Sequence, residues 1–287
     1  MTHRLRRSAL YLPASNPRAI DKARGLACDM VILDLEDAVA PEAKPAARGL
    51  AVQAVRDGGF GDRELIIRCN GLDTPWGAED LAAAAQAGPH AVLAPKINGP
   101  ADVTAYQVAI AAAPAHTKLW AMIETCAALF ALEPIAATRQ GGRLAGLCLG
   151  LNDLAKEMGA RQTPGRAAFQ AILTLTVAAG RAHDLGLLDG VFNNIDDAQG
   201  LEAECRQGAD FGFDGKSLIH PSQIEICNRV FGPNPAEVEQ ARAVIAAFAD
   251  PRNVGRGALS INGRMVERLH LRQAEALVAA AESLAAR

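Results

Sequence analysis

Two carboxylates each follow an apolar run that predicts a buried strand. Glu124 comes directly after the run at 119–123, and Asp153 comes shortly after the run at 144–150. Because the carboxyl ends of the strands meet at one face of a parallel barrel, we expect both acids there. Two carboxylates without nearby thiols or histidines suit a hard cation such as Mg²⁺. The alternative is that both acids cap or begin the helices that follow, as Asp and Glu commonly do.

Three more acids end the strand predicted at 30–37. Asp34 and Glu36 share one face of it, because side chains alternate along a strand, and Asp37 follows them. Carboxylates gathered this closely repel one another unless a cation or hydrogen-bond donors lie between them. Capping of the next loop explains Asp37 better than it explains the other two. The cluster therefore predicts a positive group nearby.

Arg68 is the natural candidate for that group. It lies within the apolar strand predicted at 64–71, which is next to the acidic strand in a barrel. A buried cation is costly unless it is paired, and a guanidinium also binds a carboxylate through two parallel hydrogen bonds. We therefore expect Arg68 either to bind an acidic substrate or to form a purely structural pair with Glu36.

Other reactive side chains carry weaker predictions. Lys96 belongs to the strand predicted at 91–97 and could form a Schiff base, but acids on the neighbouring strands would keep it protonated, which favours an electrostatic or structural role. His220, before Pro221, is either catalytic or a satisfied loop residue. The six cysteines stand far apart without C-x-x-C spacing or a partner histidine, which predicts reduced, mostly buried thiols in a cytoplasmic protein.

The elements that must position these residues alternate regularly. Helices, including a long one at 163–185, separate strands predicted at 8–13, 30–37, 64–71, 91–97, 119–123, 144–150, 187–192 and 210–217. Repeating units of roughly 25–35 residues, each pairing a strand with a helix, favour one barrel over two domains. The sequence thus predicts the α/β class and a (β/α)₈ TIM barrel.

Residues beyond the barrel form a second predicted part. We assign 1–231 to the catalytic barrel and 232–287 to a C-terminal helical extension. The extension has helices predicted at 234–248 and 269–285, around a glycine-rich, semi-extended stretch at 255–268. The residues alone leave open whether this extension packs on its own barrel or reaches a neighbouring subunit.

Composition and charge argue against several classes of protein. The 287 residues are half apolar, enough for one large core, and a net charge of −3 with scattered basic residues predicts no nucleic-acid partner. There is no apolar run of membrane-spanning length. The basic N-terminus is not followed by the apolar stretch of a secretory signal. We expect a cytoplasmic protein that does not act at a membrane.

The motifs together resemble the citrate lyase β-subunit/malyl-CoA lyase family of (β/α)₈ carbon–carbon lyases, including its citramalyl-CoA lyase-like members. The matching pieces occur in order across about 8–231. The most specific are Leu33-Asp34-Leu35-Glu36-Asp37-Ala38-Val39 and Gly215-Lys216-Ser217-Leu218-Ile219-His220-Pro221-Ser222-Gln223, and others are Ile67-Arg68-Cys69-Asn70-Gly71, Ile123-Glu124-Thr125 and Gly150-Leu151-Asn152-Asp153-Leu154.

This resemblance implies a Mg²⁺-dependent enzyme. Members of the family cleave a 3-hydroxyacyl-CoA thioester, of the citramalyl-CoA, malyl-CoA or citryl-CoA type, into an acyl-CoA and a 2-oxo acid. By the same resemblance, Glu124 and Asp153 are the metal ligands, and Glu124 also lies against the substrate. Arg68 would bind an oxygen or the carboxylate of the oxo acid beside the metal, which is a catalytic as well as a binding role.

The resemblance also implies roles for residues around this centre. Glu36 would orient Arg68 and so take part in catalysis, and Asp37 would lie against the substrate. Tyr11 and Lys22 fall where family members contact the CoA portion. These four residues come from the first two βα units of the predicted barrel.

The tail departs from the family pattern at one residue. Several members have an Asp in a G-x-M-[IV]-D context, supplied by a neighbouring subunit, and an acid is needed to protonate the enolate carbon. Here the string is Gly263-Arg264-Met265-Val266-Glu267, which makes Glu267 a candidate catalytic acid. The alternatives are weakened chemistry, a larger substrate pocket or no such role for this residue. The match in the tail implies a homo-oligomer, often a trimer or hexamer in this family, in which the extension packs on a neighbouring subunit.

Several functions are compatible with these motifs. The first is a stand-alone lyase acting on a CoA thioester. The second is the β-subunit of a multi-component citrate lyase, which uses an acyl-carrier-protein thioester. The third is a malyl-CoA thioesterase or a malate-synthase-like condensing enzyme with the same metal site. A scaffold without activity is disfavoured, because it has no use for the trio Arg68, Glu124 and Asp153.

Overall fold

A computed structural model describes residues 4–253, 255–261 and 263–285. Contacts between residues divide the chain into two compact units. One unit is Arg6–Phe231, and the other combines Gly232–Arg287 with Met1–Leu5. The packing of residues 232–287 on a neighbouring subunit stays a prediction.

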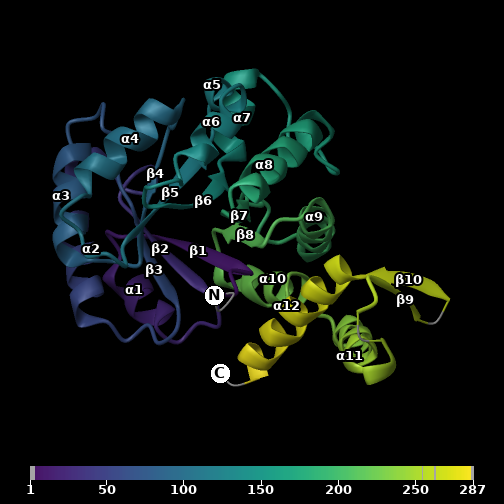
Figure 1. Cartoon of the computed structure of the whole chain (residues 1–287). Helices are drawn as coiled ribbons and strands as arrows, with labels where there is room; N and C mark the ends of the chain where they lie inside the picture. Colours follow the sequence, from purple (N-terminus) through teal and green to yellow (C-terminus); the bar gives the residue numbers. More distant parts are fainter. Residues whose placement is uncertain (1–3, 254, 262, 286–287) are drawn as a thin grey trace. The chain divides into compact units, whose positions relative to one another are not determined.

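The first unit is a closed barrel of eight parallel strands that pair in sequence order (Figure 1). The strands are β1 (Ser8–Pro13), β2 (Met30–Asp34), β3 (Glu64–Arg68), β4 (Ala91–Ala94), β5 (Lys118–Ile123), β6 (Leu144–Leu149), β7 (Gly186–Asp189) and β8 (Gly215–Leu218). Their nearly continuous apolar runs arise because both faces of each strand are buried. The predicted TIM barrel is confirmed.

Helices follow the strands and cover the outside of the barrel. They are α1 (Pro17–Ala23), α2 (Lys44–Asp57), α3 (Gly77–Ala87), α4 (Pro100–Ala109), α5 (Cys126–Leu129), α6 (Leu132–Ala137), α7 (Leu151–Met158), α8 (Gln170–Ala182), α9 (Ala198–Phe211) and α10 (Ile224–Val230). Short 3₁₀ turns occur at η1 (Pro41–Ala43), η2 (Ala167–Phe169) and η3 (Pro221–Gln223). Side chains of Asn16, Thr125 and Asp197 accept hydrogen bonds at the starts of α1, α5 and α9, as N-caps do.

The barrel interior is packed around one large side chain. Trp120 is 1% exposed and faces inward among Met30, Ile66 and Met122. Glycines on β6 and β7 make room for it, because a Cβ on Gly146 would lie 2.5 Å from the indole ring and one on Gly186 would lie 2.9 Å from it. The inside of the barrel is therefore a packed core below the strand ends.

Several predicted strands end about three residues earlier than expected, and two elements have larger boundary errors. Residues 210 and 211 belong to the end of α9 and not to the eighth strand, because the buried helical face of α9 continues to Gly212, where a φ of +101° ends the helix. The helix predicted at 163–185 begins only at Gln170. Gly165 and Arg166 have positive φ angles of +79° and +51°, which a continuous helix does not permit.

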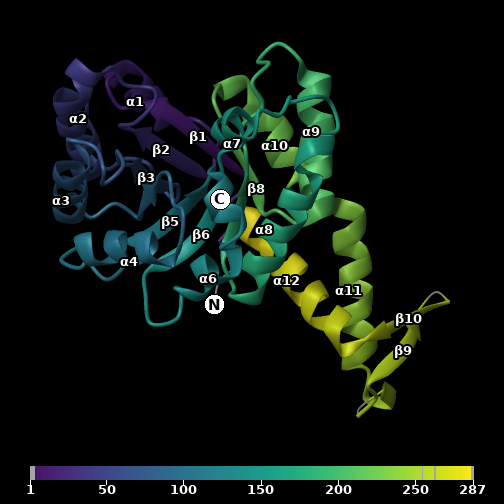
Figure 2. The same cartoon turned by 90° about the horizontal axis from the view of Figure 1, so that it is seen from above.

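The C-terminal unit contains α11 (Pro235–Ala249), η4 (Pro251–Asn253), a hairpin of β9 (Ala258–Ile261) and β10 (Arg264–Glu267), and α12 (Arg268–Ala285). The glycine-rich stretch is thus an antiparallel hairpin. Figure 2 shows α11 and α12 side by side with the hairpin at one end of the pair. Ala241, Val244 and Ala274 form the small core of this unit.

Within the described residues, no helix is long and apolar enough to cross a membrane. All six cysteines are free thiols, and five of them are buried. The Sγ atoms of Cys205 and Cys227 lie 3.6 Å apart. The sequence prediction of separate, mostly buried thiols is therefore right for their burial, although this pair is in contact.

Candidate active site

A cavity of about 290 Å³ opens at the carboxyl ends of the barrel strands. Five of the predicted site residues line it, namely Tyr11, Asp37, Arg68, Glu124 and Asp153. They come from β1, the loop after β2, the end of β3, the end of β5 and the first turn of α7. Residues far apart in the chain meet here because parallel strands deliver their ends to one face of the barrel.

Arg68 is held by a bidentate ion pair with Asp34. Its Nε lies 2.7 Å from Asp34 Oδ1, and its Nη2 lies 2.6 Å from Asp34 Oδ2. The two residues are direct neighbours in the register of β2 and β3. Arg68 Nη1 also lies 2.8 Å from Glu36 Oε2 and 3.6 Å from Asp37 Oδ2. The cation that the acidic cluster requires is therefore this guanidinium.

From the sequence, Asp34 was expected among the acids near Arg68, but Glu36 was named as the residue that orients it. Its two hydrogen bonds to Arg68 contrast with the single ion-pair contact of Glu36, so Asp34 does most of the orienting. The parallel register was the available signal, because it sets Asp34 beside Arg68. The role predicted for Glu36 remains a prediction.

The acidic loop has its own anchors. Asp34 accepts hydrogen bonds from the backbone N–H groups of Glu36 at 2.9 Å and Ala38 at 3.1 Å. The buried ammonium of Lys44 donates to the backbone carbonyl oxygens of Leu35 at 2.9 Å and Glu36 at 2.7 Å. The loop is therefore fixed by its own sequence, and Glu36 and Asp37 are presented to Arg68.

Burial sets the ionisation of the groups around Arg68. Removal from water raises the pKa of Glu36 to about 8, although the charge of Arg68 opposes this. Burial also raises the pKa of Tyr11 well above its usual range, so this side chain stays a neutral phenol. Its ring lies 4.9 Å from the Arg68 guanidinium, within cation–π distance.

Glu124 and Asp153 come together around Lys96. The ammonium nitrogen of Lys96 lies 2.7 Å from Asp153 Oδ2 and 3.6 Å from Glu124 Oε1. The backbone N–H of Lys96 also donates to Glu124 Oε1 at 2.7 Å. Burial opposes the charge of Lys96, but the hydrogen bond to Asp153 and the charge of Glu124 outweigh it and raise the pKa. Lys96 therefore has the electrostatic role that its acidic neighbours predict.

The donor set suits a divalent cation that prefers oxygen. Glu124 Oε2 is buried and has no hydrogen-bond partner within the described part of the chain, and burial raises the pKa of this carboxyl. No cluster of three or more His, Cys, Asp or Glu side chains that could hold a metal occurs among the described residues. The protein would thus supply two carboxylates, with water or substrate oxygens completing the shell, which is the usual arrangement for Mg²⁺.

The capping alternative holds for only one of the two acids. Thr125, and not Glu124, caps α5 through its hydroxyl group. Asp153 does lie in the first turn of α7, where the helix dipole favours a negative charge. Its contact with Lys96 shows that the side chain also faces the cavity.

Comparison with known proteins identifies the family. Residues 7–221 match the model of the HpcH/HpaI aldolase/citrate lyase family. The chain belongs to this family. The resemblance inferred from the motifs is confirmed.

Relatives within the HpcH/HpaI family differ in their activities. The (3S)-malyl-CoA thioesterase of Cereibacter sphaeroides is 48% identical over 280 residues, 98% of this chain and 96% of that protein. The L-malyl-CoA/beta-methylmalyl-CoA lyase of Rhodobacter capsulatus is 35% identical over an alignment of 309 positions, which covers 97% of this chain and 95% of that protein. Protein CitE of Mycobacterium tuberculosis, in complex with magnesium, acetoacetate and coenzyme A, has a TM-score of 0.77 at 31% identity, covering 96% of this chain and 97% of CitE.

Three predicted site residues are not among those that line the cavity. Glu36 is one of them, although it contacts Arg68. Lys22 is exposed on the last turn of α1 and does not line the cavity. Glu267 ends β10 in the C-terminal unit, where its backbone N–H donates to His270 Nδ1. The roles of both residues stay predictions. His220 accepts a hydrogen bond from the backbone N–H of Ser222 through Nδ1, which agrees with its interpretation as a satisfied loop residue.

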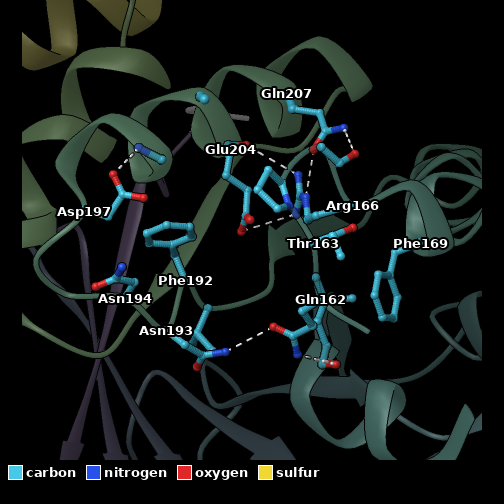
Figure 3. Close-up of a pocket in the computed structure, with 16 residues that line it drawn as sticks. Gln162, Thr163, Arg166, Phe169, Phe192, Asn193, Asn194, Asp197, Glu204 and Gln207 are labelled. Carbon is cyan, nitrogen blue, oxygen red and sulfur yellow. Dashed lines mark hydrogen bonds and ion pairs between the residues drawn. The ribbon is translucent and has the colours of Figure 1, made fainter. Parts of the chain in front are cut away.

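A second cavity, of about 590 Å³, lies beside the first, because Leu151 and Val191 line both. Figure 3 shows Arg166 and Glu204 together on one wall and Gln162 beside Asn193 on another. Arg166 lies 3.7 Å from Glu204 in this cavity and also binds the buried Asp189. The sequence analysis missed this cavity, because its loops carry no strand-end signal.

Glycine at position 150 makes room for Glu124. A Cβ there would lie 2.5 Å from both Cβ and Oε2 of Glu124, while the φ of −108° is open to any residue. We expect Gly150→Ala to push the carboxylate out of place and lower kcat/KM about 10- to 100-fold. Steady-state kinetics would measure this, with Gly49→Ala as the control, because a Cβ on Gly49 meets nothing within 4 Å. Equal kcat/KM values for the two variants would show that activity does not depend on the position of the Glu124 carboxylate.

Proposed function

We propose that this chain is a Mg²⁺-dependent hydrolase of a 3-hydroxyacyl-CoA thioester of the malyl-CoA type. The observation that carries the proposal is the 48% identity to a (3S)-malyl-CoA thioesterase over 98% of the chain. The cavity adds chemical support, because Arg68 and the pair Glu124 and Asp153, which all line it, suit a small hydroxy acid.

The groups of the cavity divide the work of holding such an acid. The Arg68 side chain is only 8% exposed, and Asp34 fixes its guanidinium. Arg68 therefore offers a preset positive charge to a substrate carboxylate. Glu124 and Asp153 would hold the Mg²⁺. When bound, the ion would supply Lewis-acid polarisation of a substrate oxygen.

Hydrolysis then requires only water as the second reactant. The oxygen of water bonds to the thioester carbonyl carbon, and the carbon–sulfur bond breaks. One hydrogen of the water ends on the carboxylic acid, and the other ends on the CoA thiol. The products are malate and free CoA, and the carbon skeleton of the acyl group stays intact.

Carbon–carbon cleavage is the second candidate. It is supported by the 35% identity to an L-malyl-CoA/beta-methylmalyl-CoA lyase and by the fact that the same groups would hold the substrate. That reaction would give acetyl-CoA and glyoxylate from malyl-CoA, and it needs an acid to protonate the enolate carbon. Glu267 is the predicted donor. A subunit that uses an acyl-carrier-protein thioester would instead leave CoA thioesters untouched.

A product assay tests these candidates together. The full-length protein would be incubated with (3S)-malyl-CoA and with citramalyl-CoA, with Mg²⁺ or with EDTA, and the products identified by mass spectrometry. We expect malate and free CoA from malyl-CoA, with the rate at least about 100-fold lower in EDTA. The rate of the Asp153→Asn variant in Mg²⁺ should be as low as the rate of wild type in EDTA. Acetyl-CoA with glyoxylate would contradict hydrolysis and establish the lyase, and no turnover would contradict both.

A further inference from the structure

We propose that the Lys96 ammonium is the resident counter-ion of the Glu124–Asp153 pair, and that a divalent cation binds there by displacing it. This inference rests on the proposed metal role of the two carboxylates. It assigns Lys96 a positioning role in setting the metal affinity of the site. Three features of this lysine support that role.

The first feature is where the ammonium lies. It is 2.7 Å from Asp153 Oδ2 and 3.6 Å from Glu124 Oε1, so it bridges the two side chains that would bind the metal. The guanidinium of Arg68, which lines the cavity, is occupied by Asp34 and Glu36. Lys96 therefore offsets the repulsion between Glu124 and Asp153 and keeps them facing one point.

The second feature is that Lys96 is held in two different ways. Its backbone has a φ of +51°, a left-handed conformation, and its N–H donates to Glu124 Oε1 at 2.7 Å. Its side chain is 37% exposed, and that of Asp153 is 34% exposed, whereas Glu124 is fully buried. The backbone contact can therefore persist while the ammonium swings towards solvent.

The third feature is electrostatic. A divalent cation and the ammonium would compete for the same oxygen of Asp153 and repel each other at contact distance. Both cannot occupy the space between the carboxylates, so metal binding must release the lysine side chain. Lys96 thus makes the empty pair stable and lowers its affinity for the metal.

Metal affinity without substrate provides the test. Mg²⁺ would be titrated into full-length wild type and Lys96→Met by isothermal calorimetry. We expect the dissociation constant of the variant to be about five- to tenfold lower, because the competing charge is gone. In EDTA the variant should melt at a lower temperature than wild type, and Mg²⁺ should raise its melting temperature by more.

Controls separate this inference from the proposed function. Lys118→Met is the matched control, because Lys118 begins β5 and its ammonium donates to the Ala115 carbonyl oxygen, and its dissociation constant should be that of wild type. If Lys96→Met folds poorly, Lys96→Gln removes the same charge. An unchanged or higher dissociation constant for the Lys96 variant would overturn the displacement. Asp153→Asn that binds Mg²⁺ like wild type, or a wild type that binds none, would overturn the metal site itself.

Discussion

Replacement of Arg68 with Gln is expected to lower kcat/KM for malyl-CoA by about 100- to 1000-fold, the range typical of losing one preset positive group in an active site. Arg68 is the buried cation that faces the cavity, and three carboxylates hold it. Glutamine is neutral and cannot reproduce the two parallel hydrogen bonds to Asp34. The substrate carboxylate would then lose its fixed partner.

Steady-state kinetics on the purified variants would measure this loss. Arg68→Lys keeps the charge without the planar fork, so its activity should fall between that of wild type and that of the glutamine variant. Arg206→Gln is the matched control, because Arg206 lies on the surface of α9, where it pairs with Glu202. A glutamine variant that keeps more than about a tenth of the activity, with an unchanged melting temperature, would remove Arg68 from the reaction.

The second large effect is expected on stability. Asp189 is fully buried and accepts hydrogen bonds from Arg166 Nη1 at 2.7 Å and Lys216 Nζ at 3.0 Å. Burial disfavours its charge, but Lys216 and Arg166 outweigh that effect and lower its pKa. Asp189→Asn would leave two buried cations facing Glu204 alone. We expect the free energy of unfolding to fall by about 3–5 kcal/mol, as when one partner of a buried ion pair is removed.

Denaturant unfolding followed by circular dichroism would measure the change. Asp196→Asn serves as the control, because Asp196 is exposed in the loop after β7, and its free energy of unfolding should stay within about 0.5 kcal/mol of wild type. A loss below about 1 kcal/mol for the Asp189 variant would show that Glu204 and water compensate both cations. The cluster would then matter for the shape of the neighbouring cavity and not for folding.

The barrel could be predicted because most of its strands are short apolar runs that end in charged or polar residues. That same signal located Arg68, Glu124 and Asp153. It could not reveal that Asp34 forms the bidentate ion pair with Arg68, since this pair depends on the register between β2 and β3. It also could not pair Arg166 with Asp189, because the 23-residue separation spans α8 and β7 and leaves no periodic pattern.

The reaction was harder to predict than the site. Thioester hydrolysis and carbon–carbon cleavage begin with the same substrate held by the same groups, so residue types at the strand ends do not distinguish them. The sequence analysis favoured the lyase, whereas the 48% identity to a thioesterase favours hydrolysis. The two reactions differ in the contacts to the attacking water or to the acid that protonates the enolate, and no strand-end motif indicates these contacts.

The packing of Trp120 against two glycines has a consequence for how this barrel can evolve. Any side chain at position 146 or 186 collides with the indole ring, so neither glycine can be replaced while the tryptophan remains. The three positions therefore change together. A smaller residue must replace Trp120 before either glycine can be substituted. Aligned descendants should show correlated change at these positions, even though all three lie below the strand ends that carry the chemistry.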